Sequence, residues 1–140
     1  MTETLVFKEV EAAYKRINDL VIHTPLLESH LLNEKLGFRL IVKPENLQKT
    51  GSFKFRGALN TIRSLTPAQR TKGVLAYSSG NHAQGVAYAA QLEGVQAAII
   101  MPKDAPSIKI ENTRSYGAEV ILYDRYTENR EEIGATIQQE

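Results

Sequence analysis

The sequence has 140 residues, of which 42% are hydrophobic and 24% charged, with a net charge of +1 and no cysteine. This length and composition suit one globular body with its own core, and the balanced charge disfavours nucleic-acid and membrane-surface proteins, which carry basic patches. Without cysteine the chain has neither disulfides nor thiolate metal sites. The first ten residues, MTETLVFKEV, lack the pattern of a signal peptide, and no apolar run reaches membrane-spanning length, so we expect a soluble, cytoplasmic protein.

The first half of the chain is predicted to be mostly helical. Apolar spacing and turn residues predict, in chain order, a helix over 5–19, a helix over 30–37, a strand over 38–43 and a helix over 53–64. Ser29 is expected to cap the second of these helices, and Gly37 to end it. The polar segment SLTPAQRTKG that follows contains a proline and a glycine and is expected to be a linker.

The second half alternates strands and helices. The pattern predicts a strand within 73–80, a helix over 81–92, a strand over 95–101, a helix to about 116, a strand over 118–123 and a helix over 128–140. Ser107 and Thr127 are expected to cap the last two helices. Such alternation predicts an α/β fold with a parallel sheet and right-handed crossovers. Because the first 60 residues supply one strand and the last helix ends the sequence, we expect the chain to be part of something longer.

A bend rich in small polar residues, YSSGNHAQG, joins the first of these strands to its helix. Free amides at a helix start, beyond the carboxyl end of a parallel strand, suit an anionic group. The bend is not a P-loop, because Val86 occupies the position of the lysine, and His82 breaks the dinucleotide-binding pattern. An anion-binding loop of another kind and an ordinary strand-to-helix turn both remain open.

Lys54 lies near the expected start of a helix, in the stretch KTGSFKFRGA. The helix dipole disfavours a cation there, and Lys49 and Arg56 act in the same direction. These surroundings favour a neutral, nucleophilic amine able to form a Schiff base, whereas an ordinary lysine would be a solvated surface residue. Gly57 and Ala58 are small residues at which this helix is expected to pack closely.

The stretches KTGSFKFRGA and SSGNHAQGVAYAA together resemble the fold-type-II pyridoxal-phosphate enzymes, in particular the threonine/serine dehydratase and serine racemase group. The likeness extends over essentially the whole chain and includes HTPLLES, VKPENLQ and MPKDAPSIKIENTRSYGAEVILY. It implies a tryptophan-synthase-β-like fold. Residues 1–66 would be the N-terminal part of a large domain, and residues 73–140 would be most of a small α/β domain of three layers.

The resemblance also implies roles for individual residues. Lys54 would bind pyridoxal 5'-phosphate through its amine and then remove the α-proton of the substrate, which loses its β-hydroxyl to give a 2-oxo acid and ammonia. Phe53 would pack against the pyridine ring, and Asn81 would hydrogen-bond its 3-hydroxyl. The substrate carboxylate would be held by the bend and the start of the following helix, namely Ser78, Ser79, Gly80, Asn81, His82 and Gln84.

Ser79 bears on which reaction is catalysed. A hydroxyl opposite Lys54 can return a proton from the other face of the cofactor and so invert the α-carbon, which makes serine racemase the alternative to L-threonine or L-serine deamination. A purely local hydrogen bond by Ser79 is equally open. No metal is expected, because His23, His30 and His82 lack metal-ligand spacing.

The resemblance implies further parts that these residues do not supply, namely a glycine-rich loop for the cofactor phosphate and a partner for the pyridine nitrogen. A truncated, non-catalytic fragment is therefore one rival, and a nucleotide-binding α/β domain is another. The expected partners are an amino-acid substrate and, by resemblance, a second copy of the parent protein, with no nucleic acid or membrane. The acidic and basic residues at 130–132 are expected to form a solvated helix face.

Overall fold

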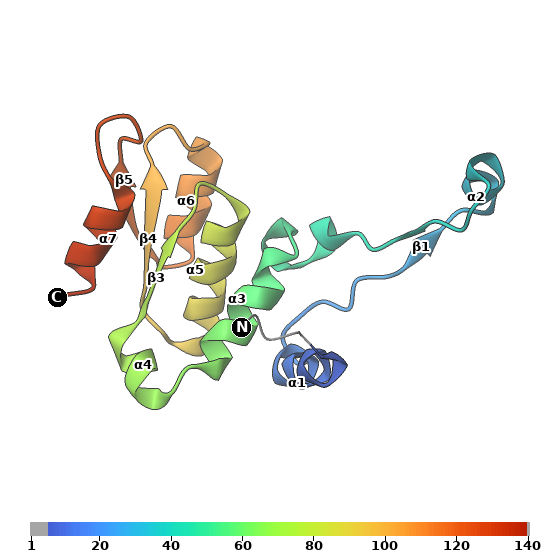
Figure 1. Cartoon of the computed structure of the whole chain (residues 1–140), viewed down its shortest axis with the longest axis horizontal. Helices are drawn as coiled ribbons and strands as arrows, with labels where there is room; N and C mark the ends of the chain where they lie inside the picture. The colour runs from blue at the N-terminus through green and yellow to red at the C-terminus, as the bar shows by residue number, and fades with distance from the viewer. Residues whose placement is uncertain (1–5, 140) are drawn as a thin grey trace.

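The computed structural model describes residues 6–139, and its centre is a three-stranded parallel sheet (Figure 1). The strands are β3 (Val74–Tyr77), β4 (Ala97–Pro102) and β5 (Glu119–Tyr123), in the order β3-β4-β5. Val74 pairs with Ala97, and Ala98 pairs with Glu119. The central strand is the most buried, with Ile99, Ile100 and Met101 fully covered, as expected for a strand with a neighbour on each side and helices over its faces.

Helices cover the sheet on both faces, which makes the three layers predicted for this half of the chain. Helices α5 (Asn81–Glu93) and α6 (Ser107–Ser115) lie on one side, and α7 (Arg130–Ile137) lies on the other (Figure 1). α7 approaches the sheet at Gly134, where a Cβ atom would stand 1.7 Å from the Tyr77 hydroxyl oxygen. A larger residue at this position would force the Tyr77 ring to move.

The first half of the chain lies partly near the sheet and partly in an extension away from it. Its elements are α1 (Phe7–Ile17), β1 (Leu27–Glu28), α2 (His30–Leu36), β2 (Ile41–Val42), the 3₁₀ turns η1 (Glu45–Leu47) and η2 (Lys49–Gly51), and α3 (Lys54–Ser64). β1 and β2 form a short antiparallel ribbon that carries α2 away from the rest of the molecule (Figure 1). We call residues 25–43 the arm.

The hydrophobic core lies between α3, α5 and the sheet. α3 places Phe55, Leu59 and Ile62 against the alanine-rich face of α5, and all three side chains are almost completely buried. Small alanines on α5 let the two helices approach closely, and large side chains on α3 fill the remaining space. The core thus joins the helix that begins at Lys54 to the helix that begins at Asn81.

An ion-pair network at the far end of α3 strengthens this junction. Arg63 donates to Glu93 of α5 at 2.7 Å, to Asp19, and to the backbone oxygen of Arg16. The two carboxylates raise the pKa of the Arg63 guanidinium above its ordinary value, mainly through their hydrogen bonds. The network connects α1, α3 and α5 through one side chain.

Most predicted elements are confirmed, and five details are wrong. The predicted linker contains a helix, α4 (Pro67–Lys72), because Thr66 and Gln69 form a capping box and Pro67 occupies the first turn. β1 was not predicted, and the strand predicted over 38–43 is only the two residues of β2. Helix α6 begins at Ser107 itself, after Pro106, and α7 is capped by Asn129 rather than Thr127.

The limits of two predicted helices, Leu5 and Glu140, lie outside the described residues. Ser29 and Gly37 cap and end α2 as predicted, with Gly37 in the left-handed conformation. Among residues 6–139, no helix is both long enough and apolar enough to cross a membrane. The domain division at about residue 70 stays a prediction.

Candidate active site

The segment before Lys54 is held by buried side chains and unusual backbone geometry. Gln48 is buried and exchanges two hydrogen bonds with the backbone of Ile22, at 2.9 and 2.8 Å. Thr50 has a φ of 61°, a left-handed conformation that is uncommon for a β-branched residue. Such strain, of about 1–3 kcal/mol, persists where the surrounding structure imposes it and is concentrated at functional sites. Lys54 is thus placed by a segment with little freedom.

Gly85 brings the α5 helix against the backbone of Lys54. A Cβ atom at position 85 would lie 3.2 Å from the carbonyl carbon of Lys54, 3.2 Å from the nitrogen of Phe55, and 3.4 Å from the Cβ of Lys54. Glycine is therefore the residue that permits this approach. The close packing predicted at Gly57 is wrong, since a Cβ atom there would meet no described atom within 4 Å, whereas Ala58 is buried as predicted.

The bend at 78–82 lies on the same side of α5 as Lys54. Burial, and then the charge of Lys54, hold the pKa of His82 below its ordinary value. The Lys54 side chain is exposed, and its Nζ lies 5.0 Å from the centre of the Phe53 ring. Phe53 thus lies beside the amine, and the Gly85 contact brings the backbone of Lys54 to the helix that follows the bend, while the juxtaposition of the amine with the bend stays a prediction.

Two cations predicted to act on Lys54 are engaged elsewhere. The guanidinium of Arg56 donates to both carboxylate oxygens of Glu45, at 2.7 and 2.8 Å, and this pairing holds the pKa of Glu45 at about 2. The Lys49 ammonium lies over the rings of Phe55 and Tyr88, at 5.8 and 5.7 Å. The expectation that Arg56 acts on Lys54 as an unpaired charge is wrong, because Glu45 compensates it.

Helix α5 begins without a side-chain cap on its first amides. The hydroxyl of Ser78 accepts a hydrogen bond from the Gly80 backbone N–H at 3.2 Å, which shapes the bend. Ser79 is exposed at its tip, as are Asn81 and His82. Free amides at the positive end of a 13-residue helix suit a carboxylate, and binding of one at the bend stays a prediction.

Two amide side chains on the first turn of α5 contact α6. Lys109 donates to Oδ1 of Asn81 at 2.8 Å, and Asn112 donates to Oε1 of Gln84 at 2.9 Å. Gln84 is 2% exposed, and its Nε2 has no partner among the described residues. Neither Lys109 nor Asn112 was singled out from the sequence, because contacts between two helices 28 residues apart leave no local signal.

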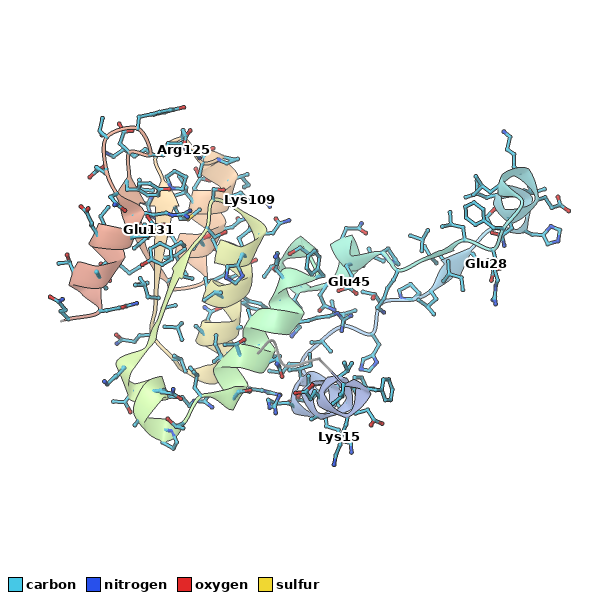
Figure 2. The ribbon with its side chains drawn as sticks, in the orientation of Figure 1. Lys15, Glu28, Glu45, Lys109, Arg125 and Glu131 are labelled. Atoms are coloured by element: carbon cyan, nitrogen blue, oxygen red, sulfur yellow. The ribbon has the colours of Figure 1, made fainter. Side chains whose placement is uncertain are left out.

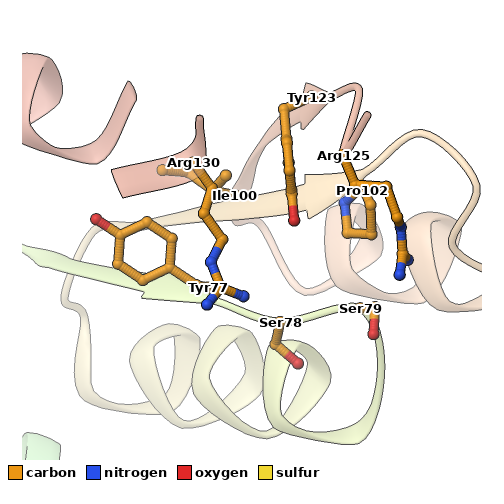
Figure 3. A pocket seen from close by; sticks show the side chains of 8 residues that line it. All are labelled: Tyr77, Ser78, Ser79, Ile100, Pro102, Tyr123, Arg125 and Arg130. Carbon is orange, nitrogen blue, oxygen red and sulfur yellow. The ribbon is translucent and has the colours of Figure 1, made fainter. Parts of the chain in front are cut away.

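A hollow of about 90 Å³ lies beyond the carboxyl ends of the strands, beside the bend (Figure 3). It is lined by Tyr77, Ser78, Ser79, Ile100, Pro102, Tyr123, Arg125 and Arg130. Figure 3 shows the two arginine side chains reaching from beyond β5 toward the serines. Arg130 belongs to the solvated face predicted at 130–132, with its side chain 51% exposed, and it also lines this hollow. The position of Arg125 two residues after β5 could have revealed it, whereas Arg130 begins α7.

The groups around Lys54 fit pyridoxal phosphate in their chemistry. The site offers an amine, a hydrogen-bonding amide at Asn81, and two buried hydroxyls without partners among the described residues, those of Thr50 and Ser52. Unpaired buried polar groups are costly unless a ligand or water satisfies them. The grouping of Lys54 with Ser79, Asn81 and the other bend residues, and their individual roles, stay predictions.

Comparison with known proteins gives consistent results. Residues 17–140 match the family model described as "Pyridoxal-phosphate dependent enzyme". The chain is 50% identical over 128 residues to an L-threo-3-hydroxyaspartate ammonia-lyase of Saccharomyces cerevisiae, covering 91% of this chain and 39% of that enzyme. It is 46% identical to a serine racemase of Schizosaccharomyces pombe, covering 98% of this chain and 43% of that protein.

Solved structures show the same likeness in three dimensions. The crystal structure of serine racemase from Dictyostelium discoideum superimposes with a TM-score of 0.91 at 41% identity, covering 96% of this chain and 44% of that one. The chain therefore spans about two fifths of the length of the relatives it matches.

Proposed function

Because the chain belongs to the pyridoxal-phosphate dependent enzyme family, we propose that the protein deaminates a β-hydroxy amino acid, such as L-threonine or L-serine, to a 2-oxo acid and ammonia. The single observation that carries this proposal is the close approach of Gly85, in the helix that follows the bend at 78–82, to the backbone of Lys54. The relatives named ammonia-lyases and racemases support it.

Each group would have a definite task. The cofactor, when bound, supplies the electron sink for bond breaking at the α-carbon. Lys54 would hold it and then take the α-proton on its amine, and the bend amides and hydroxyls would orient the substrate carboxylate. Asn81 would contact the ring oxygen, with Phe53 beside the ring. Loss of the β-hydroxyl as water leaves an aminoacrylate, which water converts to the 2-oxo acid and ammonia.

The arginines near the bend favour a substrate with a second carboxylate. Arg125 and Arg130 line the hollow beside Ser78 and Ser79, where the β-substituent of a substrate held at the bend would extend. A guanidinium pairs well with a carboxylate. Arg125 already pairs with Asp104 and Arg130 with Glu131, so a substrate carboxylate would replace these exposed partners. 3-Hydroxyaspartate is therefore our preferred substrate, as in the name of the yeast relative.

Arg130→Met should raise KM for 3-hydroxyaspartate about tenfold while leaving KM for L-threonine within about twofold. Equal changes for both substrates would contradict the assignment.

Serine racemisation is the second candidate, and Ser79 is the observation that favours it. Its hydroxyl lies at the tip of the bend, lines the hollow and is exposed, so a proton can reach it from solvent. A hydroxyl on the face opposite Lys54 can return a proton to the α-carbon and invert it.

The test is direct binding of the cofactor at Lys54. The protein is mixed with pyridoxal phosphate, the adduct is reduced with borohydride, and the modified peptide is identified by mass spectrometry. We expect modification at Lys54, loss of the visible absorbance in Lys54→Ala, and no change in Lys72→Ala, which removes another exposed lysine. Modification spread over many lysines, or unchanged absorbance in Lys54→Ala, would refute the proposal.

The resemblance also leads us to propose a homodimer. Sedimentation of the full-length protein tests this. A single species with the mass of one chain at micromolar concentration would contradict it.

A further inference from the structure

Two side-chain contacts join the first turn of α5 to α6 in matching register. Lys109 and Asn112 are three residues apart on α6, and they reach Asn81 and Gln84, which are three residues apart on α5. Residues three apart lie on one face of a helix, so the two contacts lie one above the other. Figure 2 shows Lys109 at the end of α5 where that helix begins.

The chemistry of the donors determines how the Asn81 amide is turned. A lysine ammonium has three donors and no acceptor. Because its Nζ lies 2.8 Å from the Asn81 side chain, the atom facing it is the amide oxygen Oδ1. The Asn81 N–H₂ group is then directed away from Lys109 and is available to an acceptor. Without Lys109, either end of this exposed amide could face a ligand.

The packing of α6 on α5 depends on residues other than Lys109 and Asn112. Ile110 and Thr113 are buried on α6, with exposures of 8% and 0%, whereas Lys109 and Asn112 are only partly covered. The Thr113 hydroxyl donates to the backbone oxygen of Lys109 at 2.7 Å, which satisfies this buried hydroxyl. The Lys109 side chain is thus placed by a rigid helix but is not needed to fill the core.

We propose that Lys109 is a positioning residue that turns the Asn81 amide so that its N–H₂ group donates to a deprotonated ring oxygen of the cofactor. This inference rests on the proposed function. A hydrogen bond from N–H to an anionic oxygen is stronger than one to a neutral hydroxyl. Lys109 would therefore favour the deprotonated form of the bound cofactor without touching it.

The experiment compares substitutions at Lys109 in the full-length protein loaded with pyridoxal phosphate. The cofactor bound to a lysine absorbs at longer wavelength when its ring oxygen is deprotonated, so the ratio of the two bands reports the protonation state. We expect Lys109→Met to lower the long-wavelength fraction about fivefold. Lys109→Glu, which can only accept, should lower it further, and Lys109→Arg should restore it.

Two controls separate positioning from charge and from packing. Lys103→Met removes a lysine of the neighbouring loop, whose side chain is 60% exposed, and should leave the band ratio unchanged. Asn112→Ala removes the parallel contact between the same two helices and should affect unfolding without changing the bands. If Asn112→Ala and Lys109→Met changed the bands equally, Lys109 would act only through helix packing, and the proposal would fail.

The decisive measurement is a double-mutant cycle between positions 81 and 109. If Lys109 acts through Asn81, Lys109→Met has no further effect on the band ratio in an Asn81→Ala background. An equal effect in both backgrounds would mean that Lys109 acts directly through its charge, which overturns the proposal. Failure of the proposed function is seen separately, because the starting protein would then show no absorbance that depends on Lys54.

Discussion

Replacing Gly85 by alanine tests the packing that positions Lys54. The added methyl would stand 3.2 Å from two backbone atoms of α3, the carbonyl carbon of Lys54 and the nitrogen of Phe55. Backbone cannot swing aside as a flexible side chain can, so the start of α3 would have to move by a few tenths of an ångström. Overpacking of this kind costs about 1–3 kcal/mol. Alanine in a helix gains about 0.5–1 kcal/mol over glycine. The net effect is between no change and a loss of about 2.5 kcal/mol.

Gly57→Ala is the matched control. It lies in α3, where the new methyl would meet no described atom within 4 Å, so only the helix gain of about 0.5–1 kcal/mol remains. Urea unfolding of both variants gives the difference, which we expect to be about 1–3 kcal/mol against Gly85→Ala. Borohydride trapping of pyridoxal phosphate at Lys54 should be slower in Gly85→Ala and normal in Gly57→Ala. If Gly85→Ala stabilised the protein as much as Gly57→Ala, the reasoning about this contact would be wrong.

Three further predictions concern charge and proton transfer. Arg56 holds the pKa of Glu45 at about 2, so the ion pair stabilises the fold above pH 4.5 and this stabilisation is lost as the pH falls toward 2. In urea titrations, Glu45→Gln should lower the free energy of unfolding by about 2 kcal/mol at pH 7 and hardly at all at pH 2. The same loss of stability at both pH values would contradict the pairing. Ser79→Ala should keep deamination and abolish racemisation, measured by chiral chromatography of serine, and joint loss of both would refute separate roles. Arg63→Met should cost about 2 kcal/mol in urea unfolding, because Glu93 loses its closest donor, and a cost no larger than that of an exposed arginine would refute its role as a hub.

The second half of the fold was predictable because each of its elements has a complete local signal. The strand around Ile99 and Ile100 is a continuous apolar run between turn residues, and Gly94 ends the preceding helix in the left-handed conformation. The linker was mispredicted because its proline was interpreted as a helix breaker. At the first position of a helix, Pro67 is favourable, and Thr66 supplies the cap.

The candidate site was predictable in its motifs and not in its surroundings. Lys54 and the bend were recognisable from two short stretches, because their residue types are unusual together. The pairing of Arg56 with Glu45 and the contact of Lys109 with Asn81 depend on the tertiary arrangement of separate elements. Charges near in sequence were expected to act on Lys54, whereas the fold brings an acid to one of them.

The arm opens at a lower free-energy cost than the core that carries Lys54. Its ribbon pairs two residues on each strand, and apolar side chains such as Leu31 and Phe38 are 78% and 58% exposed. It is secured chiefly by Glu28, which accepts hydrogen bonds from Arg39 and Asn33. Such a segment opens locally at little cost while the core stays folded. Amide exchange in the arm should thus be insensitive to substitutions at Arg63 or Leu59, and a melting curve of the whole protein will not detect damage to the arm.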